Sequence, residues 1–143
     1  MESKLRCALW MGVAAGLLCL AGCGGPSSVA SLRSSSHQVY SFEVAADYQV
    51  VHERILLRAR QRYSLPNQPR IQLGVSAQVS PESRSSTITL WNGGGIGIRY
   101  RLIAEIQAID PDRTRVDLYA AGKPDRAEAR LWAGWADTPM EKK

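Results

Sequence analysis

The stretch IGIRYRLIAEIQAIDPDRTRVDLYAA, residues 96–121, contains two alternating segments joined by a polar turn. Apolar side chains occupy every second position over 96–108 and again over 116–120. A two-residue period is typical of a strand with one face in a core and the other in water. The DPDR sequence at 110–113 is a turn signal, because Pro fixes φ and Asp bonds to its own backbone. The stretch therefore predicts an antiparallel hairpin with one buried face.

Shorter alternating segments extend this hairpin into a sheet. Apolar side chains stand mainly at every second position in three further segments, which are therefore predicted to be strands: 38–45, 71–79 and 87–91. The glycine-rich sequence at 92–95 predicts a hairpin loop. Because the last four strands follow one another through short turns, we expect an antiparallel meander.

A helix is predicted between the first two strands. Asp47 can accept a hydrogen bond from a free N–H of the first turn, and the helical pattern runs to Tyr63, ahead of the breaker cluster at 65–69. Apolar and aromatic side chains gather on one side of this helix, which is therefore predicted to be its buried face: Tyr48, Val51, Ile55, Leu56, Ala59 and Tyr63.

A second helix is predicted to end near residue 137. Asp125 and Glu128 stand at the spacing of a capping box, in which each would bond a free N–H of the first turn. Ala127, Leu131 and Trp135 recur every four residues, so we expect this line to face the core.

The element order β-α-β-β-β-β-α predicts an α+β fold with a single antiparallel sheet and both helices packed on one face. The chain is long enough for one domain, expected over 38–138 and followed by a disordered tail at 139–143.

The sequence Leu20-Ala21-Gly22-Cys23 ends an apolar run that follows the cations Lys4 and Arg6. This run is shorter than the about 20 residues that a transmembrane helix needs, and it fits a signal peptide with small residues at its cleavage point. A cysteine directly after Leu-Ala-Gly matches a bacterial lipobox. Residues 1–22 are therefore predicted to be a lipoprotein signal peptide, with Cys23 as the lipid attachment site. A plain secretory signal cut near Ala21 and an uncleaved anchor are the alternatives.

The segment after the lipobox is predicted to be a flexible tether. Residues 24–36, GGPSSVASLRSSS, are rich in Gly and Ser and hold little apolar surface to bury. Residues 23–37 are thus expected to be the lipidated cysteine and its tether. In a Gram-negative envelope, Gly24 differs from the Asp of an inner-membrane retention signal, so the expected location is the outer membrane, facing the periplasm; the sequence does not specify the Gram type.

Composition restricts the chemistry of the mature domain. Two of the three cysteines, Cys7 and Cys19, leave with the signal and Cys23 carries lipid, so no disulfide and no thiolate is expected. The full chain carries a net charge of +5 and is mildly basic, which suits anionic lipid headgroups or plain solubility. Export to the envelope makes nucleic acid an unexpected partner.

The element order, the lipobox, the VAADY run at 44–48 and the DPDRT run at 110–114 together resemble a known domain type. They are similar to the helix-grip or TBP-like domains of the outer-membrane lipoprotein BamC and of small proteobacterial lipoproteins. The resemblance covers about residues 39–137 and implies the fold and the membrane location. It carries over no functional residues, since a shared fold does not fix a function. BamC has two such domains on a long extension, whereas this chain has one.

The residues that usually carry catalysis are poorly placed. His37 ends the tether, and His52 lies at the edge of the buried helical arc, where a structural histidine is expected. The GGGIG sequence at 93–97 precedes a strand rather than a helix, so it lacks the helix N-terminus of a phosphate site. No metal, cofactor or catalytic residue is predicted. An enzyme using His52, Asp47 or Glu105 is the least favoured alternative.

The best candidate for an interaction surface is the solvent-exposed face of the sheet. Arg99 and Arg101 are expected to share this face, with Arg115, Trp91 and Tyr119 beside them. Arginines between aromatic rings can hold an anionic polymer or an acidic segment of a partner. The alternative is a solvated face whose charges are balanced by nearby carboxylates.

The sequence therefore predicts a non-catalytic, membrane-anchored envelope lipoprotein that serves as an interaction or scaffold module. The alternative is a carrier or sensor that binds an amphiphile or an anionic ligand. A pocket between the sheet and the helices would favour the carrier. The sequence specifies no oligomeric state.

Overall fold

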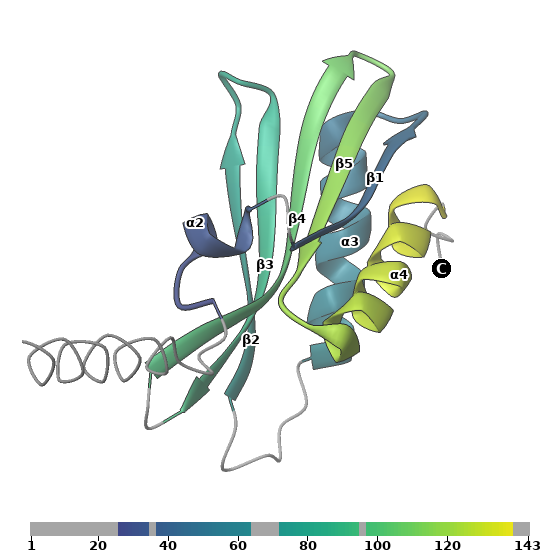
Figure 1. Cartoon of the computed structure of the whole chain (residues 1–143). Helices are drawn as coiled ribbons and strands as arrows, with labels where there is room; N and C mark the ends of the chain where they lie inside the picture. The colour runs from purple at the N-terminus through teal and green to yellow at the C-terminus, as the bar shows by residue number, and fades with distance from the viewer. Residues whose placement is uncertain (1–25, 35–36, 64–71, 95–96, 139–143) are drawn as a thin grey trace, which may run out of the picture.

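The computed structural model describes residues 26–34, 37–63, 72–94 and 97–138 (Figure 1). Its elements are α2 (Val29–Leu32), β1 (Gln38–Val44), α3 (Tyr48–Tyr63), β2 (Gln72–Ser80), β3 (Ser85–Gly94), β4 (Gly97–Asp110), β5 (Arg113–Ala120) and α4 (Lys123–Asp137). The five strands form one antiparallel sheet in the order β1-β5-β4-β3-β2. The predicted α+β fold with a single antiparallel sheet is confirmed.

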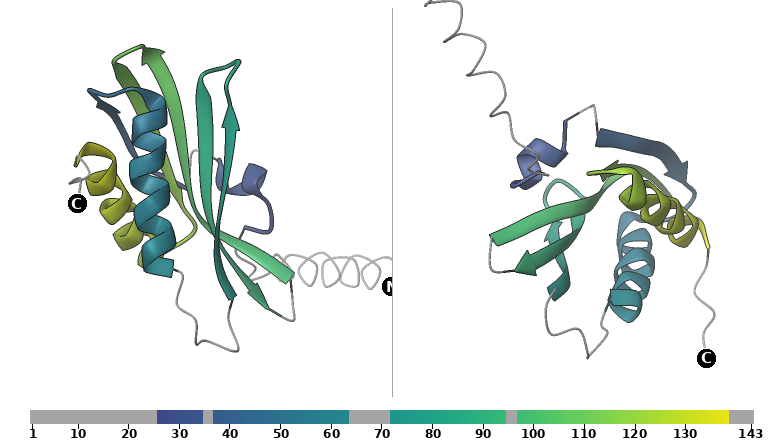
Figure 2. Two further views of the ribbon diagram at one scale, coloured as in Figure 1. Left: turned by 180° about the vertical axis from the view of Figure 1, so that it is seen from behind. Right: turned by 60° about the horizontal axis from the view of Figure 1, so that its bottom comes forward.

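Two helices, α3 and α4, cover one face of the sheet, whereas α2 lies against the opposite face (Figures 1 and 2). We call the face under α3 and α4 the inner face and the other the outer face. The expectation that the two predicted helices pack on one face is confirmed for α3 and α4, and α2 is an additional helix that was not predicted from the sequence. The predicted signal peptide and the C-terminal tail at 139–143 lie outside the described residues, as does the breaker cluster.

The segment predicted to be a flexible tether instead folds back onto the sheet, as far as its described residues show. Ser28 caps α2 through a capping box, accepting a hydrogen bond from the Ser31 N–H at 3.1 Å. Leu32 is fully buried, as is Ile103 on β4, the strand that α2 contacts. The overall composition of this segment, rich in Gly and Ser, does not predict the docking. The cap at Ser28 and the buried side chain of Leu32 are enough to fix one turn of helix on the sheet.

The inner face carries the main core. Helix α3 begins after Asp47, whose Oδ1 accepts a hydrogen bond from the Gln49 N–H at 2.8 Å, so the predicted cap is confirmed. The fully buried side chains of this core come from α3, α4 and the three central strands: Val51, Ile55, Ala59, Ile88, Leu90, Leu102, Ala104, Val116, Leu118, Ala129, Trp132 and Ala136.

Helix α4 presents a different face from the predicted one. Its buried residues are Asp125, Ala129, Trp132 and Ala136, while Leu131 is 40% exposed. A strict four-residue repeat drifts by about 40° around the helix at each step, so Ala127, Leu131 and Trp135 do not form one stripe. Alternating steps of four and three residues, as in the buried set, keep one face toward the sheet.

The capping box predicted for α4 is also wrong. The N-cap is Gly122, with Pro124 in the first turn and no side-chain cap bond. The carboxylates of Asp125 and Glu128 bond instead to side chains of β4 and α3. Helix α4 therefore starts three residues earlier than the spacing suggests, because Pro provides its first turn.

A β-bulge interrupts the long strand β4. Leu90 pairs with Leu102, but the next residue, Trp91, pairs with Tyr100, which leaves Arg101 as the extra residue. The side chain of Tyr100 thus shares the face of Trp91 rather than that of Leu102. The unbroken alternation predicted over 96–108 fails at this point.

None of the helices in the described part of the chain is both long enough and apolar enough to span a bilayer.

The stability of the helix layer is expected to depend on Trp132 rather than on the predicted core residue Leu131. Trp132→Ala should lower the free energy of unfolding by about 3–5 kcal/mol, since it leaves a large cavity. The matched change Leu131→Ala should cost under about 1 kcal/mol, because this side chain is already partly in water. Urea unfolding followed by far-UV circular dichroism measures both. Equal losses would contradict the observed helix orientation.

Candidate functional site

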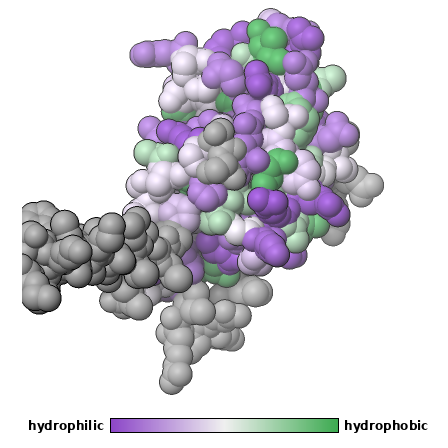
Figure 3. Space-filling model, in the orientation of Figure 1, coloured by the Kyte–Doolittle hydropathy of each residue, from purple (hydrophilic) through white to green (hydrophobic). Residues whose placement is uncertain are grey.

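The outer face of the sheet carries a network of charged side chains around α2. Arg33, at the end of α2, forms an ion pair with Glu105 on β4 and donates to Thr87 Oγ1 on β3 at 3.4 Å. On β5, Arg115 pairs with Asp117 at 3.3 Å. Figure 3 shows this face as mostly hydrophilic, with small separate hydrophobic areas. The charges are therefore largely balanced on the sheet itself.

A hollow of about 570 Å³ opens on this face between α2 and the turns that join the strands. Its lining is polar and includes Arg33, Gln78, Thr87, Glu105, Gln107 and Arg115. Hydroxyl, amide and guanidinium groups offer directional hydrogen bonds, and polar atoms make up the larger part of the lining. This arrangement suits a polar partner and not the alkyl chain of an amphiphile.

Tyr119 lies in the same region, on β5 opposite Ile103. Burial raises the pKa of its phenol, and the nearby charges of Glu105 and Asp117 raise it further. The hydroxyl therefore stays protonated at neutral pH and keeps a proton to donate.

The structure does not bring the predicted interaction set together in one place. Arg115 and Tyr119 lie on the outer face near the hollow, with Arg115 among its lining residues. Trp91 lies farther along the outer face, where its indole covers Gly74 of β2 so closely that a Cβ there would collide with the ring. Arg99 is exposed and pairs in register with Asn92, away from Arg115. The expectation of one continuous patch is wrong.

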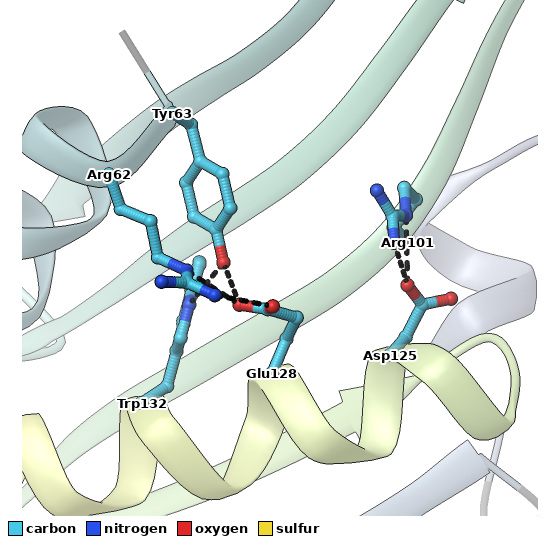
Figure 4. A network of polar contacts seen from close by, with 6 residues as sticks. All are labelled: Arg62, Tyr63, Arg101, Asp125, Glu128 and Trp132. Carbon is cyan, nitrogen blue, oxygen red and sulfur yellow. Dashed lines mark hydrogen bonds and ion pairs between the residues drawn. The ribbon is translucent and has the colours of Figure 1, made fainter. Parts of the chain in front are cut away.

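Arg101 does not lie on the outer face, where it was predicted. Its guanidinium donates two hydrogen bonds to Oδ1 of Asp125, at 2.8 and 2.6 Å, and Asp125 is only 6% exposed (Figure 4). The β-bulge at Arg101 turns this side chain toward the start of α4. Arg101 therefore ties the sheet to α4, and no feature of the alternating sequence signals the bulge.

A second polar cluster joins the C-terminal end of α3 to α4 (Figure 4). Arg62 donates to both carboxylate oxygens of Glu128, at 3.1 and 3.0 Å, and the Tyr63 hydroxyl donates to Oε2 at 2.5 Å. The Trp132 indole N–H in turn donates to the Tyr63 oxygen at 3.3 Å. Burial and the bond to Glu128 raise the pKa of Tyr63 to about 12. These groups are engaged with one another, and the cluster acts as a clamp between the two helices.

The three side chains that an enzymatic interpretation would use each have a structural partner. His52 is 8% exposed and its Nδ1 lies 3.0 Å from Ser86 Oγ. Burial lowers the pKa of His52, so the ring is neutral at pH 7. Asp47 caps α3, and Glu105 pairs with Arg33. Within the described ranges, no three His, Cys, Asp or Glu side chains are grouped as a metal site would require.

No protein-family model matches this chain, and no curated protein matches it by sequence.

The helix clamp predicts a specific loss of stability in acid. Burial alone would raise the pKa of Glu128, but the bonds from Arg62 and Tyr63 outweigh it and hold the pKa below its usual value of 4.5. The Glu128 carboxylate therefore stabilises the folded state at pH values above the pKa that Glu128 has in the unfolded chain. This stabilisation is lost as the pH falls through the lower pKa that Glu128 has in the folded protein.

We expect Glu128→Gln to destabilise the protein by about 1–3 kcal/mol at pH 7, since a charge-assisted bond is weakened. The difference in free energy of unfolding between wild type and variant, which we call the gap, should narrow as pH falls below the usual glutamate pKa of 4.5. Urea unfolding at a series of pH values measures the gap. A gap that does not change between pH 7 and pH 3 would show that the carboxylate charge is not what Arg62 and Tyr63 bind.

Proposed function

We propose that this chain is a lipid-anchored envelope protein whose α+β domain serves as an interaction module at the periplasmic face of the outer membrane. The observation that carries this proposal is the LAGC sequence at 20–23, placed after a basic start and an apolar run. Lipid on Cys23 would provide a stable anchor, because each buried methylene contributes about 0.8 kcal/mol and two or three chains act together.

The polar hollow beside α2 supports an interaction role for the domain. It lies on the face that α3 and α4 leave uncovered, and it offers hydrogen-bonding groups whose positions are fixed by the strands. We infer that a polar or charged segment of another envelope component binds there. The middle of the inner face has no room for an amphiphile, since its central side chains are fully buried against α3 and α4. A hollow of about 530 Å³ does lie between β1 and α4, but its lining includes Arg126 and Arg130, which suit a polar ligand better than an alkyl chain.

Lipidation is expected to depend on Cys23. The full chain, expressed in a Gram-negative host fed an alkyne fatty acid, should take up label and sediment with the outer membrane. Cys23→Ser should take up no label, while Cys19→Ser, also in the apolar run, should be labelled as wild type. An inhibitor of lipoprotein signal peptidase should cause the unprocessed form to accumulate. Unlabelled wild-type protein would overturn the anchor.

The interaction role is tested by photo-crosslinking in intact cells. A photoreactive residue at Gln107 or Gln78, both lining the hollow, should give the same adduct with an envelope component. The same residue at Gln61, exposed on α3, is the matched control and should give none. Arg115→Glu should abolish the adduct, because it reverses a charge in the lining. Adducts no stronger than those at Gln61 would count against binding at this face.

A further inference from the structure

The N-terminal segment approaches the sheet at one end of the β3–β4 hairpin. The Tyr100 N–H donates a hydrogen bond to the Pro26 carbonyl at 3.3 Å, and α2 follows with Leu32 fully buried. Pro26 is three residues from Cys23. A residue spans at most about 3.6 Å, so these three residues cover no more than about 11 Å. A lipid on Cys23 would hold this end of the hairpin close to the bilayer surface.

The side chains at this end match those that proteins place at a membrane surface. Trp91 and Tyr100 are paired across β3 and β4 and share the outer face. Ile98 is 52% exposed, the most exposed of the large hydrophobic side chains that the structure describes. Tryptophan and tyrosine are enriched at the level of the lipid headgroups, where one part of the ring is apolar and another is polar.

The charge at this end has the sign that phospholipid headgroups attract. Arg99, next to Ile98, is exposed and has no ion-pair partner among the described residues. The other described arginines on the strands, Arg101, Arg113 and Arg115, are in contrast each paired with a carboxylate of the domain. By the register, Arg99 lies on the opposite face of the hairpin from Ile98, Trp91 and Tyr100. The hairpin end thus carries apolar and aromatic side chains on one face and a cation on the other, which combines apolar insertion with electrostatic attraction.

We propose that this end of the hairpin, formed by Trp91, Ile98, Arg99 and Tyr100, is a second membrane contact that lays the domain on the phospholipid surface. The proposal rests on the lipid anchor of the proposed function. The hairpin end lies at the lower left of Figure 1, away from α4 and the C-terminus. Contact at this end leaves α3 and α4 facing away from the lipid, and the polar hollow lies toward the other end of β4.

Tryptophan quenching by brominated lipid tests the contact directly. The lipidated mature protein is reconstituted in phosphatidylethanolamine–phosphatidylglycerol vesicles with and without bromine on the acyl chains. Trp10 leaves with the signal, Trp132 is fully buried under the helices, and Trp135 lies on α4. We expect brominated lipid to quench the wild type and to leave Trp91→Phe nearly unquenched. Equal quenching of wild type and Trp91→Phe would overturn the proposal.

The two ends of β4 provide a matched pair of variants. Ile98→Asp places a charge at the proposed contact, whereas Ile109→Asp places one at the far end of the strand, on a side chain that is 43% exposed. Eleven residues of strand separate them by roughly 36 Å. Ile98→Asp should lose most of the Trp91 quenching, because a carboxylate is costly in the bilayer, and Ile109→Asp should keep it. Equal effects would contradict a localised contact.

Separate measurements test the lipid anchor on Cys23 and the membrane contact of the hairpin end. The mass of the mature protein and its flotation with vesicles report the lipid on Cys23, independently of any fluorescence. Protein that carries no lipid refutes the anchor. Protein that is lipidated and floats, with Trp91 quenched no more than its Phe variant, leaves the anchor intact and refutes the hairpin contact. That second result would assign the exposed end to a protein partner.

Discussion

The arrangement of this domain depends on a central strand that is buried on both faces. Leu102 of β4 is covered by α3 and α4, and its neighbour Ile103 is buried on the outer face, where α2 brings Leu32. An antiparallel sheet commonly leaves one face in water. In this domain a single turn of helix covers the middle of the second face. The same docking fixes where the N-terminal segment leaves the sheet, which is beside Tyr100.

The sheet, helix α3 and the turns could be predicted from the sequence because their signals are local. In the described residues, strands lie where the alternation over 71–79 and 116–120 predicts them, and the cap at Asp47 and the turn at 110–113 form as expected. The apolar face of β2 is buried only in part, since Val79 is 45% exposed. Asp110, for example, accepts a hydrogen bond from the Asp112 N–H at 3.1 Å. In each case the residues that specify the structure lie within a few positions of one another.

The features that the sequence did not reveal depend on distant contacts. The bulge at Arg101 is fixed by pairing with β3 and by Asp125 on α4, 24 residues away. The burial of Leu32 requires a surface on β4 that exists only in the folded sheet. The orientation of α4 follows from a three-and-four spacing that competes with a simpler four-residue repeat. For these reasons the predicted patch of Arg99, Arg101 and Arg115 is divided.

The proposed anchor and the docked α2 together determine how far the domain stands from the membrane. Neutron reflectometry of the lipidated protein on a supported bilayer measures this distance as the thickness of the water layer beneath the protein. A docked segment predicts a gap of no more than about 11 Å, set by the three residues that follow Cys23. A flexible tether over 23–36 would instead give a gap of roughly 20 Å. A gap of that larger size would contradict the docking of α2 on the sheet.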